Sequence, residues 1–383
     1  MSEQKWTACW GNATSITDRR ECVYAKDITL RYPIRIPFSG SALRLRFSNL
    51  TGTEAVTLTR VFINKESLLF GGKHDVTIAP GCEVESDPLP IAIQADETVN
   101  VSIYLGECTQ MNAGTLITGP LSTGQFAHGD YALCDELPLD RTRSTNWFYF
   151  LNTIDILTSP DNFALICYGD SITAQSWPDY LALRCAKEGL RNVAIIRRAV
   201  SGSRILRQYD CIPYQAYGLK GETRFPIEMN VAGARAVIIQ HGINDMIHPV
   251  GTDVNPFRPW SDMPTLQELT EGVERLYIAH ARQLGLQVWA GTLLPIEGWR
   301  TYTAERDVLR QQFNEWLRTA SCFDGCIDFD AAVRNPEHPT AFLPSFDSGD
   351  HLHPSEQGYD AMAHCVKSEL LTPPHPSPTG EGE

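Results

Sequence analysis

The stretch NFALICYGDSIT, residues 162–173, joins a short apolar run to a polar turn that contains a serine. The apolar part, residues 162–168, has the length of a buried strand. A helix is expected to follow, with Ser176 as its cap, Pro178 in its first turn and Gly189 at its exit. Ser171 therefore lies where a buried strand passes into a helix, a place that can expose a serine hydroxyl beside backbone N–H groups.

Strands and helices alternate along the rest of the chain. Short apolar runs predict strands at residues 193–196, 236–239, 288–290 and 327–329. Apolar residues spaced by three and four predict helices at residues 266–276, 308–317 and 359–370. This alternation predicts a parallel sheet covered by helices on both faces. In such a sheet, ligands bind beyond the carboxyl ends of the strands.

The first 150 residues have a different pattern. Apolar side chains occupy the even positions of residues 28–36 and the odd positions of residues 43–47, which is the period of a half-buried strand. Many short strands separated by turn residues predict a β-sandwich. We therefore expect a jelly-roll-like β-sandwich domain at residues 1–155, an α/β domain at 156–371 and a disordered tail, rich in proline and glycine, at 372–383.

Composition excludes several classes of partner. The 383 residues are 43% hydrophobic and carry a net charge of −14, so nucleic acid and anionic membranes are not expected partners. No apolar stretch has the length of a signal peptide or a membrane span, which predicts a cytoplasmic protein, with a removed leader left open. The 11 cysteines are irregularly spaced and predict free thiols rather than a zinc site. A homo-oligomer is also left open.

Four polar motifs follow predicted strands or precede the last predicted helix. They are GDSIT with Ser171, AVSGSR with Gly202, HGIND with Asn244, and DSGDHLHP with Asp350 and His353. Taken singly, each has a simpler explanation, namely a helix cap or a plain turn. Taken together at one edge of a sheet, they supply a nucleophile, a base, an orienting carboxylate and donors for an oxyanion.

A metal site is the alternative for the last motif. Asp350, His351 and His353 are all metal-ligand types. No further cluster of histidine or carboxylate side chains has a recognisable ligand spacing. Neither a metal nor another cofactor is therefore expected.

The four motifs together resemble those of the SGNH hydrolases, also called GDSL esterases and lipases. The resemblance covers residues 160–370, with Ile172 in place of the leucine of the GDSL name. It implies a flavodoxin-like three-layer α/β/α domain that hydrolyses carboxylic esters without a cofactor. It also implies roles for the motif residues: Ser171 as nucleophile, His353 as general base, Asp350 as its orienting partner, and an oxyanion hole made of the Ser171 and Gly202 N–H groups and the Asn244 side chain.

The first half of the chain resembles the β-rich N-terminal region of a bacterial subgroup of this family. The pattern Trp6-x-x-x-Trp10 and the segment LRFSN at residues 45–49 are similar to that subgroup's usual opening. This second resemblance implies that a β-rich domain precedes the hydrolase domain.

The substrate is predicted to be a small-molecule or carbohydrate ester with a short acyl chain, above all an O-acetyl group on a carbohydrate. Because both halves of the chain are acidic, a neutral ester is expected rather than a polyanion. Asp170, Trp177 and Trp299 are the candidate substrate-binding residues, and core packing is the alternative for both tryptophans. The alternative functions are a longer-chain lipase or lysophospholipase, a thioesterase, and a carbohydrate-binding protein without catalysis.

Overall fold

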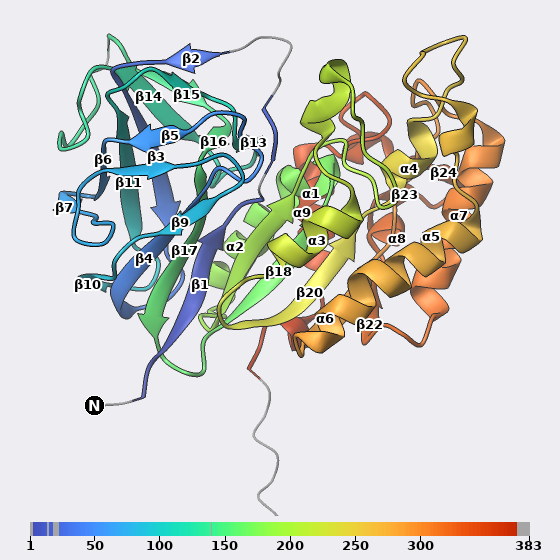
Figure 1. Cartoon of the computed structure of the whole chain (residues 1–383). Coiled ribbons are helices and arrows are strands. Elements are labelled where there is room, and N and C mark those ends of the chain that lie inside the picture. The colour runs from blue at the N-terminus through green and yellow to red at the C-terminus, as the bar shows by residue number, and fades with distance from the viewer. Residues whose placement is uncertain (1–2, 14, 18–22, 139, 374–383) are drawn as a thin grey trace, which may run out of the picture.

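A computed structural model of the chain describes residues 3–13, 15–17, 23–138 and 140–373. A β-rich N-terminal region and a C-terminal α/β region lie side by side (Figure 1). Most of the tail predicted at residues 372–383 lies outside the described residues. Within the described part, no helix has both the length and the apolar character needed to cross a membrane.

Two antiparallel sheets account for most of the N-terminal region. The first has the strand order β1-β17-β4-β10, with β9 also paired to β4, and the second has the order β15-β14-β3-β11-β6-β7. Three smaller pairs, β12 with β2, β13 with β16 and β5 with β8, complete the region. The strands are β1 (Lys5–Gly11), β2 (Tyr24–Ala25), β3 (Ile28–Arg35), β4 (Gly40–Ser48), β5 (Val56–Leu58), β6 (Arg60–Ile63), β7 (Glu66–Ser67), β8 (Val76–Ile78), β9 (Glu83–Glu85), β10 (Leu89–Ile93), β11 (Thr98–Leu105), β12 (Thr109–Gln110), β13 (Gly114–Leu116), β14 (Gly124–His128), β15 (Arg143–Thr145), β16 (Trp147–Tyr149) and β17 (Leu151–Thr158).

The alternating pattern of the sequence places one row of side chains of β4 in the core. In β4, Leu43, Leu45 and Phe47 are fully buried, as the odd-position pattern predicts. The β-rich character of this region is therefore confirmed. The sandwich arrangement and the boundary after residue 155 stay predictions, and β17, a strand of the first N-terminal sheet, continues to Thr158.

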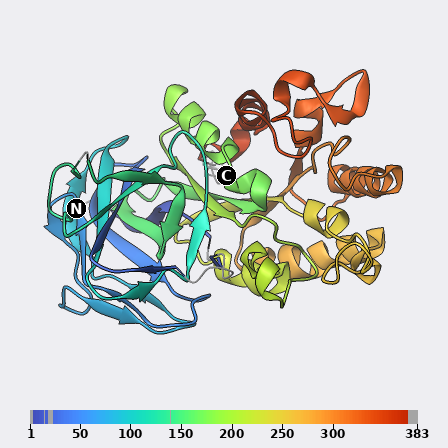
Figure 2. The same ribbon diagram turned by 90° about the horizontal axis from the view of Figure 1, so that it is seen from above.

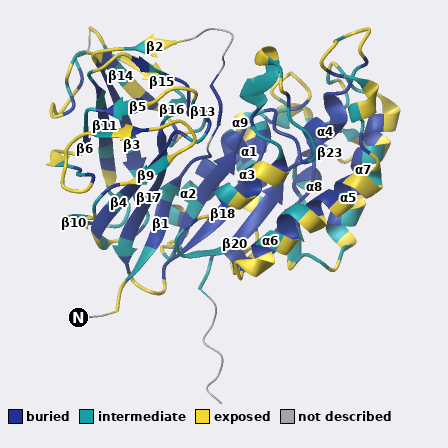
Figure 3. Cartoon of the chain, viewed as in Figure 1, coloured by how far each residue is buried: buried dark blue, intermediate teal, exposed yellow. Residues whose placement is uncertain are grey.

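A parallel sheet forms the centre of the C-terminal region. Its strand order is β19-β18-β20-β21-β22, which is the 2-1-3-4-5 order of a flavodoxin-like sheet and confirms the predicted fold. All seven residues of β18 are buried, because helices cover both faces of the sheet (Figure 3). The strands are β18 (Phe163–Gly169), β19 (Val193–Ala199), β20 (Ala234–Gln240), β21 (Gln287–Gly291) and β22 (Gly325–Ile327).

Two groups of helices make up the outer layers. Helices α2, α8 and α9 pack together on one side, while α3 and α5 to α7 lie on the other (Figure 2). A short hairpin of β23 (Arg334–Asn335) and β24 (His338–Phe342) follows α8. The helices are α1 (Ser171–Ala174), α2 (Trp177–Lys187), α3 (Gly221–Glu228), α4 (Ile243–Ile247), α5 (Leu266–Val273), α6 (Ala279–Gln283), α7 (Ala304–Thr319), α8 (Phe329–Val333) and α9 (Glu356–Cys365).

Two predicted elements end earlier than the sequence suggests. The helix predicted at residues 359–370 stops at Cys365, because Arg184 of α2 donates to the carbonyl oxygens of Ala363, His364 and Val366. The strand predicted at residues 327–329 stops at Ile327. There the Asp328 side chain accepts the N–H of Ala331 and begins α8.

Buried arginines of β19 join the two regions. Arg198 donates to the carbonyl oxygen of Asn152 at 3.0 Å and to the hydroxyl of Thr153 at 2.7 Å, both in β17. Arg197 donates to the Ser122 hydroxyl at 3.0 Å. Since a buried guanidinium must keep its hydrogen bonds, these contacts fix the N-terminal region against the edge strand of the parallel sheet.

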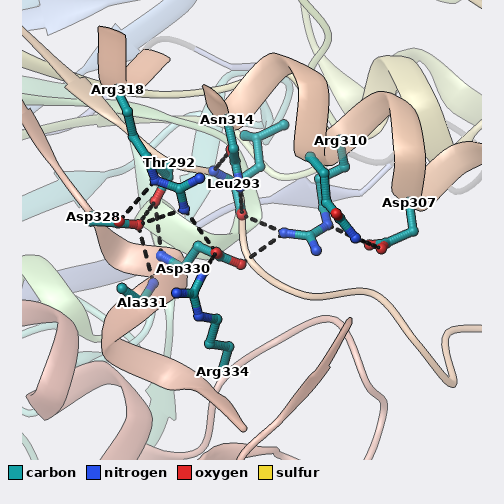
Figure 4. A network of polar contacts seen from close by, with 11 residues as sticks. Thr292, Leu293, Asp307, Arg310, Asn314, Arg318, Asp328, Asp330, Ala331 and Arg334 are labelled. Atoms are coloured by element: carbon teal, nitrogen blue, oxygen red, sulfur yellow. Dashed lines mark hydrogen bonds and ion pairs between the residues drawn. The ribbon is translucent and has the colours of Figure 1, made fainter. Parts of the chain in front are cut away.

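A second ionic network ties α7 to the ends of β21 and β22 (Figure 4). The buried Asp330 carboxylate accepts hydrogen bonds from Arg310 at 2.8 Å, Arg318 at 2.9 Å and Arg334 at 2.8 Å. Arg310 also donates to the carbonyl oxygen of Leu293, just beyond β21. Asp330 therefore links helices and strands that are distant in the sequence.

Candidate active site

The ends of three neighbouring strands bring the first three motifs to one edge of the sheet. Gly169 of β18 lies in register with Ala199 of β19 and with Gln240 of β20. Ser171, Gly202 and Asn244 follow these three register positions within a few residues. Parallel strands end at the same edge, so the three motifs meet beyond the carboxyl ends of the strands, as predicted.

The fourth motif reaches Ser171 through His353. The Ser171 hydroxyl oxygen lies 2.8 Å from Nε2 of His353. On the other side of the imidazole, Nδ1 lies 2.7 Å from Oδ2 of Asp350. The three side chains thus form a continuous hydrogen-bonded chain from a hydroxyl to a carboxylate.

The loop before α9 holds Asp350 in its ionised form. Oδ1 of Asp350 accepts the backbone N–H of Leu352 at 2.9 Å and that of His353 at 2.8 Å. It also accepts the Ser348 hydroxyl at 3.1 Å. Partial burial disfavours the charge, but the side-chain and backbone donors of His353 and the N–H of Leu352 outweigh it and lower the pKa of Asp350 below its usual range. The carboxylate is therefore an acceptor only, and Nδ1 of His353 must carry a proton.

Gly202 occupies a conformation that its turn requires. Its φ of +80° belongs to the left-handed region, where side chains are rarely found. A Cβ at this position would also lie 2.2 Å from the ring of Tyr217. Both facts explain why a glycine stands here.

Asn244 is fixed against the same turn. It is buried near the start of α4, and its Nδ2 donates to the carbonyl oxygen of Ser203 at 3.1 Å. An amide nitrogen has two N–H groups, and within the described residues no protein acceptor takes the second. The arrangement can therefore offer an N–H beside the Gly202 turn.

A buried arginine that no motif of the sequence singles out supports this edge. Arg224 of α3 donates to the carbonyl oxygens of Gly169 and Arg198 and to the Ser203 hydroxyl, at 2.8, 3.2 and 3.2 Å. Its guanidinium lies 4.2 Å from the centre of the Tyr168 ring. Only the folded chain brings Arg224 to these strand ends, so no local sequence signal could have found it.

His241 completes the support in its neutral form. Nε2 lies 3.1 Å from the carbonyl oxygen of Ser203, which can only accept, so Nε2 carries the proton. Nδ1 then accepts the Tyr277 hydroxyl at 2.9 Å. Burial and the charge of Arg224 lower the pKa of His241 well below its usual value. The ring is therefore a fixed, uncharged part of the site's support.

The three candidate substrate-binding residues have different surroundings. Asp170 is fully buried as the cap of α1, and burial raises its pKa to about 7. Trp177 is also fully buried, against Phe329, and has no exposed face on which a sugar could stack. This placement corrects the stacking hypothesis for Trp177 and agrees with core packing. Trp299 is half-buried, and its ring centre lies 6.4 Å from that of His353.

A metal-binding cluster is not found in the part of the chain that the structure describes. No three or more His, Cys, Asp or Glu side chains gather there in a way that could hold an ion. His351 is held instead by Asp347, whose Oδ2 lies 2.5 Å from Nδ1 of the ring.

Comparison with known structures gives distant likenesses. An α/β hydrolase, LAE5, from the metagenome of Lake Arreo is 16% identical, with a TM-score of 0.41, over 55% of this chain and 94% of that one. A variant of Axe2, an acetyl xylan esterase from Geobacillus stearothermophilus, is 20% identical, with a TM-score of 0.39, over 57% of this chain and 100% of that one. No curated protein matches the chain.

The family model gives a direct assignment. The model of the GDSL-like lipase/acylhydrolase family matches residues 167–361, which is about half of the 383 residues. The matched segment contains the four motifs that meet at the edge of the parallel sheet. The chain therefore belongs to the GDSL-like lipase/acylhydrolase family and is a carboxylic ester hydrolase.

Proposed function

We propose that the protein is a serine esterase in which Ser171, His353 and Asp350 act as a catalytic triad. The observation that carries this proposal is the pair of hydrogen bonds on the two nitrogens of His353, 2.8 Å to Ser171 and 2.7 Å to Asp350. With its proton on Nδ1, His353 presents an unprotonated Nε2 to the serine hydroxyl. Ser171 attacks the ester carbonyl carbon while Nε2 takes the hydroxyl proton.

The leaving alcohol and the acyl-enzyme follow from the same geometry. The imidazolium returns its proton to the alcohol oxygen as the carbon–oxygen bond breaks, which leaves the acyl group on Ser171. A water molecule then gives a proton to Nε2 and attacks the acyl carbon, which releases the carboxylic acid and restores the serine. The Asp350 carboxylate stabilises the imidazolium in both halves of the cycle.

The developing oxyanion is proposed to bind three N–H donors. These are the backbone N–H of Ser171 at the start of α1, the backbone N–H of Gly202 and the side-chain amide of Asn244. Each such donor is worth about 2.7–4 kcal/mol of barrier in known cases. The contacts of Arg224 and His241 with Ser203 keep the turn that carries the Gly202 N–H, and against which Asn244 is fixed, in place before the substrate arrives.

The proposed substrates are short-chain esters, with O-acetyl groups on carbohydrates as the natural form. Trp299 supports this choice, because it is a partly exposed aromatic side chain beside His353 that could pack against a sugar ring. A series of p-nitrophenyl esters of increasing chain length tests the acyl preference. Highest kcat/KM for acetate or propionate is expected, and a maximum at long acyl chains would refute the short-chain proposal.

Ser171→Ala tests the nucleophile. We expect turnover of an aryl acetate to fall by several powers of ten, and a fluorophosphonate probe to label the unmodified protein but not the variant. Ser159→Ala is the matched control, since Ser159 lies in an exposed turn before β18, at the opposite end of that strand. Unchanged turnover in Ser171→Ala, or no labelling of the unmodified protein, would overturn the proposal.

A further inference from the structure

A cluster of tyrosines and arginines lies beside the Gly202 turn. Neighbouring rings within it are 4.9 Å apart for Tyr209 and Tyr214, and 5.0 Å for Tyr217 and His248, measured between ring centres. The cluster is built by two loops, residues 204–217 and 248–258, that both follow strands of the parallel sheet. The tyrosine–arginine cluster, as we call it, consists of Arg204, Tyr209, Tyr214, Tyr217, His248 and Arg258.

Arg258 is the member whose charge is not neutralised. It is 9% exposed, and its guanidinium lies 4.5 Å from the centre of the Tyr214 ring. The one side-chain hydrogen bond it makes within the described residues is a long one, 3.5 Å, to the Tyr217 hydroxyl. Its Nε has no partner there, and no carboxylate pairs with it. Arg204, in contrast, forms an ion pair with Asp262 at 3.0 Å.

An unpaired guanidinium in this position is costly without a ligand. An arginine keeps its charge at any pH relevant to a protein, so burial cannot be relieved by loss of a proton. Buried charges are usually paired in folded proteins, since the loss of hydration is otherwise not compensated. Arg258 is therefore suited to bind an anion, and its planar guanidinium can form two parallel hydrogen bonds to a carboxylate.

The cluster is next to the reacting atoms. Tyr217, whose hydroxyl lies 3.5 Å from Arg258, covers Gly202 so closely that a Cβ on that glycine would be 2.2 Å from the tyrosine ring. On the His353 side of the site, the exposed Arg300 lies 4.4 Å from the centre of the Trp299 ring. No carboxylate within the described residues pairs with Arg300. Two uncompensated guanidinium groups therefore flank the proposed catalytic residues.

The charges of Arg258 and Arg300 both act on the buried ring of His248. Burial lowers the pKa of His248 well below its usual value, and the charges of Arg258, Arg204 and Arg300 lower it further, in that order. These three charges are positive in a chain whose net charge is −14.

We propose that Arg258 and Arg300 bind a carboxylate carried by the ester substrate, which makes the substrate an acylated acid rather than a neutral ester. The inference rests on the proposed esterase function and names its substrate class. The aromatic faces of the cluster favour a sugar acid as the alcohol part, because sugar rings pack on tyrosine and tryptophan. A carboxylate on the acyl part offers the same chemistry from the other side of the ester.

Two pairs of substrates test the proposal. O-acetylated galacturonate is compared with O-acetylated galactose, and an aryl hemisuccinate with an aryl butyrate, so that each acid has a neutral counterpart of similar shape. We expect kcat/KM for the acid to exceed that for its counterpart about tenfold or more in at least one pair. The pair that shows the preference identifies the side of the ester that carries the carboxylate.

Single substitutions connect that preference to the two arginines. Arg258→Gln and the exposed Arg300→Gln are each expected to bring the ratio of acid to neutral kcat/KM close to one, and Arg258→Lys to retain part of it. Arg275→Gln is the matched control, since it removes the same charge from an exposed side chain on an outer helix. It should leave the ratio unchanged.

Two results would overturn the proposal. One is equal kcat/KM for acid and neutral esters in both pairs, and the other is an acid preference that survives in both Arg258→Gln and Arg300→Gln. Arg300 is exposed, so a fold defect in the Arg258 variant cannot hide the outcome. Hydrolysis of neutral esters that depends on Ser171 but shows no acid preference would refute this inference and leave the esterase proposal intact.

Discussion

The proton position on His353 depends on Asp350, and Asp350→Asn is expected to reverse it. In the structure, Oδ1 of Asp350 accepts three donors, from Ser348, Leu352 and His353, while Oδ2 faces Nδ1 of the imidazole. In an asparagine at this position, the three donors hold the amide oxygen in the place of Oδ1. The NH2 group then faces Nδ1 and donates to it. The imidazole proton must therefore move to Nε2, which can no longer accept the proton of Ser171, 2.8 Å away.

The expected loss is large because the base is removed while the fold is kept. The same change in a Ser-His-Asp protease lowers kcat about 10⁴-fold through the wrong tautomer. A factor of this size corresponds to about 5.5 kcal/mol of activation free energy. Asparagine has nearly the shape of aspartate and keeps the three accepted bonds on Oδ1, so the urea midpoint should change little.

Hydrolysis of p-nitrophenyl acetate measures the effect, and the same loop supplies a matched control. Asp347 lies beside His351 as Asp350 lies beside His353, but no hydrogen bond joins His351 to the serine. Asp347→Asn should therefore keep kcat within a few-fold of the unmodified protein. Retention of more than about a tenth of kcat in Asp350→Asn would refute the reasoning. Equal losses in the two variants would instead assign the damage to the loop.

Four further predictions follow from single sites and need one assay each. Gly202→Ala should lower kcat on an aryl acetate about 10²-fold, since it forces a side chain into positive φ against Tyr217; full activity would contradict this. Asp330→Asn should destabilise the fold by about 3 kcal/mol in urea, with exposed Asp161→Asn neutral, because three arginines lose the negative charge they share and one acceptor oxygen becomes an NH2 donor. Burial raises the folded-state pKa of Asp170 to about 7, so unfolding free energy should fall from pH 5 to pH 7, and Asp170→Asn should flatten that slope. EDTA should leave activity intact; strong inhibition would revive a metal role.

The motifs were visible in the sequence because their placement follows from strand periodicity. Three polar segments come directly after buried apolar runs, and parallel strands end at one edge, so Ser171 and Asn244 are expected to lie near each other. The pairing of Ser171 with His353 could not be derived from spacing, since 182 positions separate them. The family resemblance implied this pairing, and the Ser171–His353 hydrogen bond of the structure agrees with it.

The side chains that support the site could not be identified from a sequence pattern. Arg224 lies in α3, a helix that the apolar pattern does not reveal because Pro226 interrupts it and its hydrophobic residues are few. Its contacts to Gly169 and Ser203 are made across strands that meet only in the fold. Trp177 is the reverse case. Its proximity in sequence to Ser171 suggested a binding role, but the fold directs its ring into the core.

Net charge and local charge lead to different substrates here. The total of −14 favours a neutral ester, because the field of the whole chain repels anions at long range. At physiological ionic strength, however, charges are screened over about 8 Å, so distant carboxylates contribute little at the reacting ester. The electrostatic potential at the ester therefore depends mainly on nearby groups. Among these, Arg258 is almost buried and has no carboxylate partner within the described residues. Buried charges are screened far less than exposed ones, so this local charge outweighs the sum over the chain in selecting a ligand.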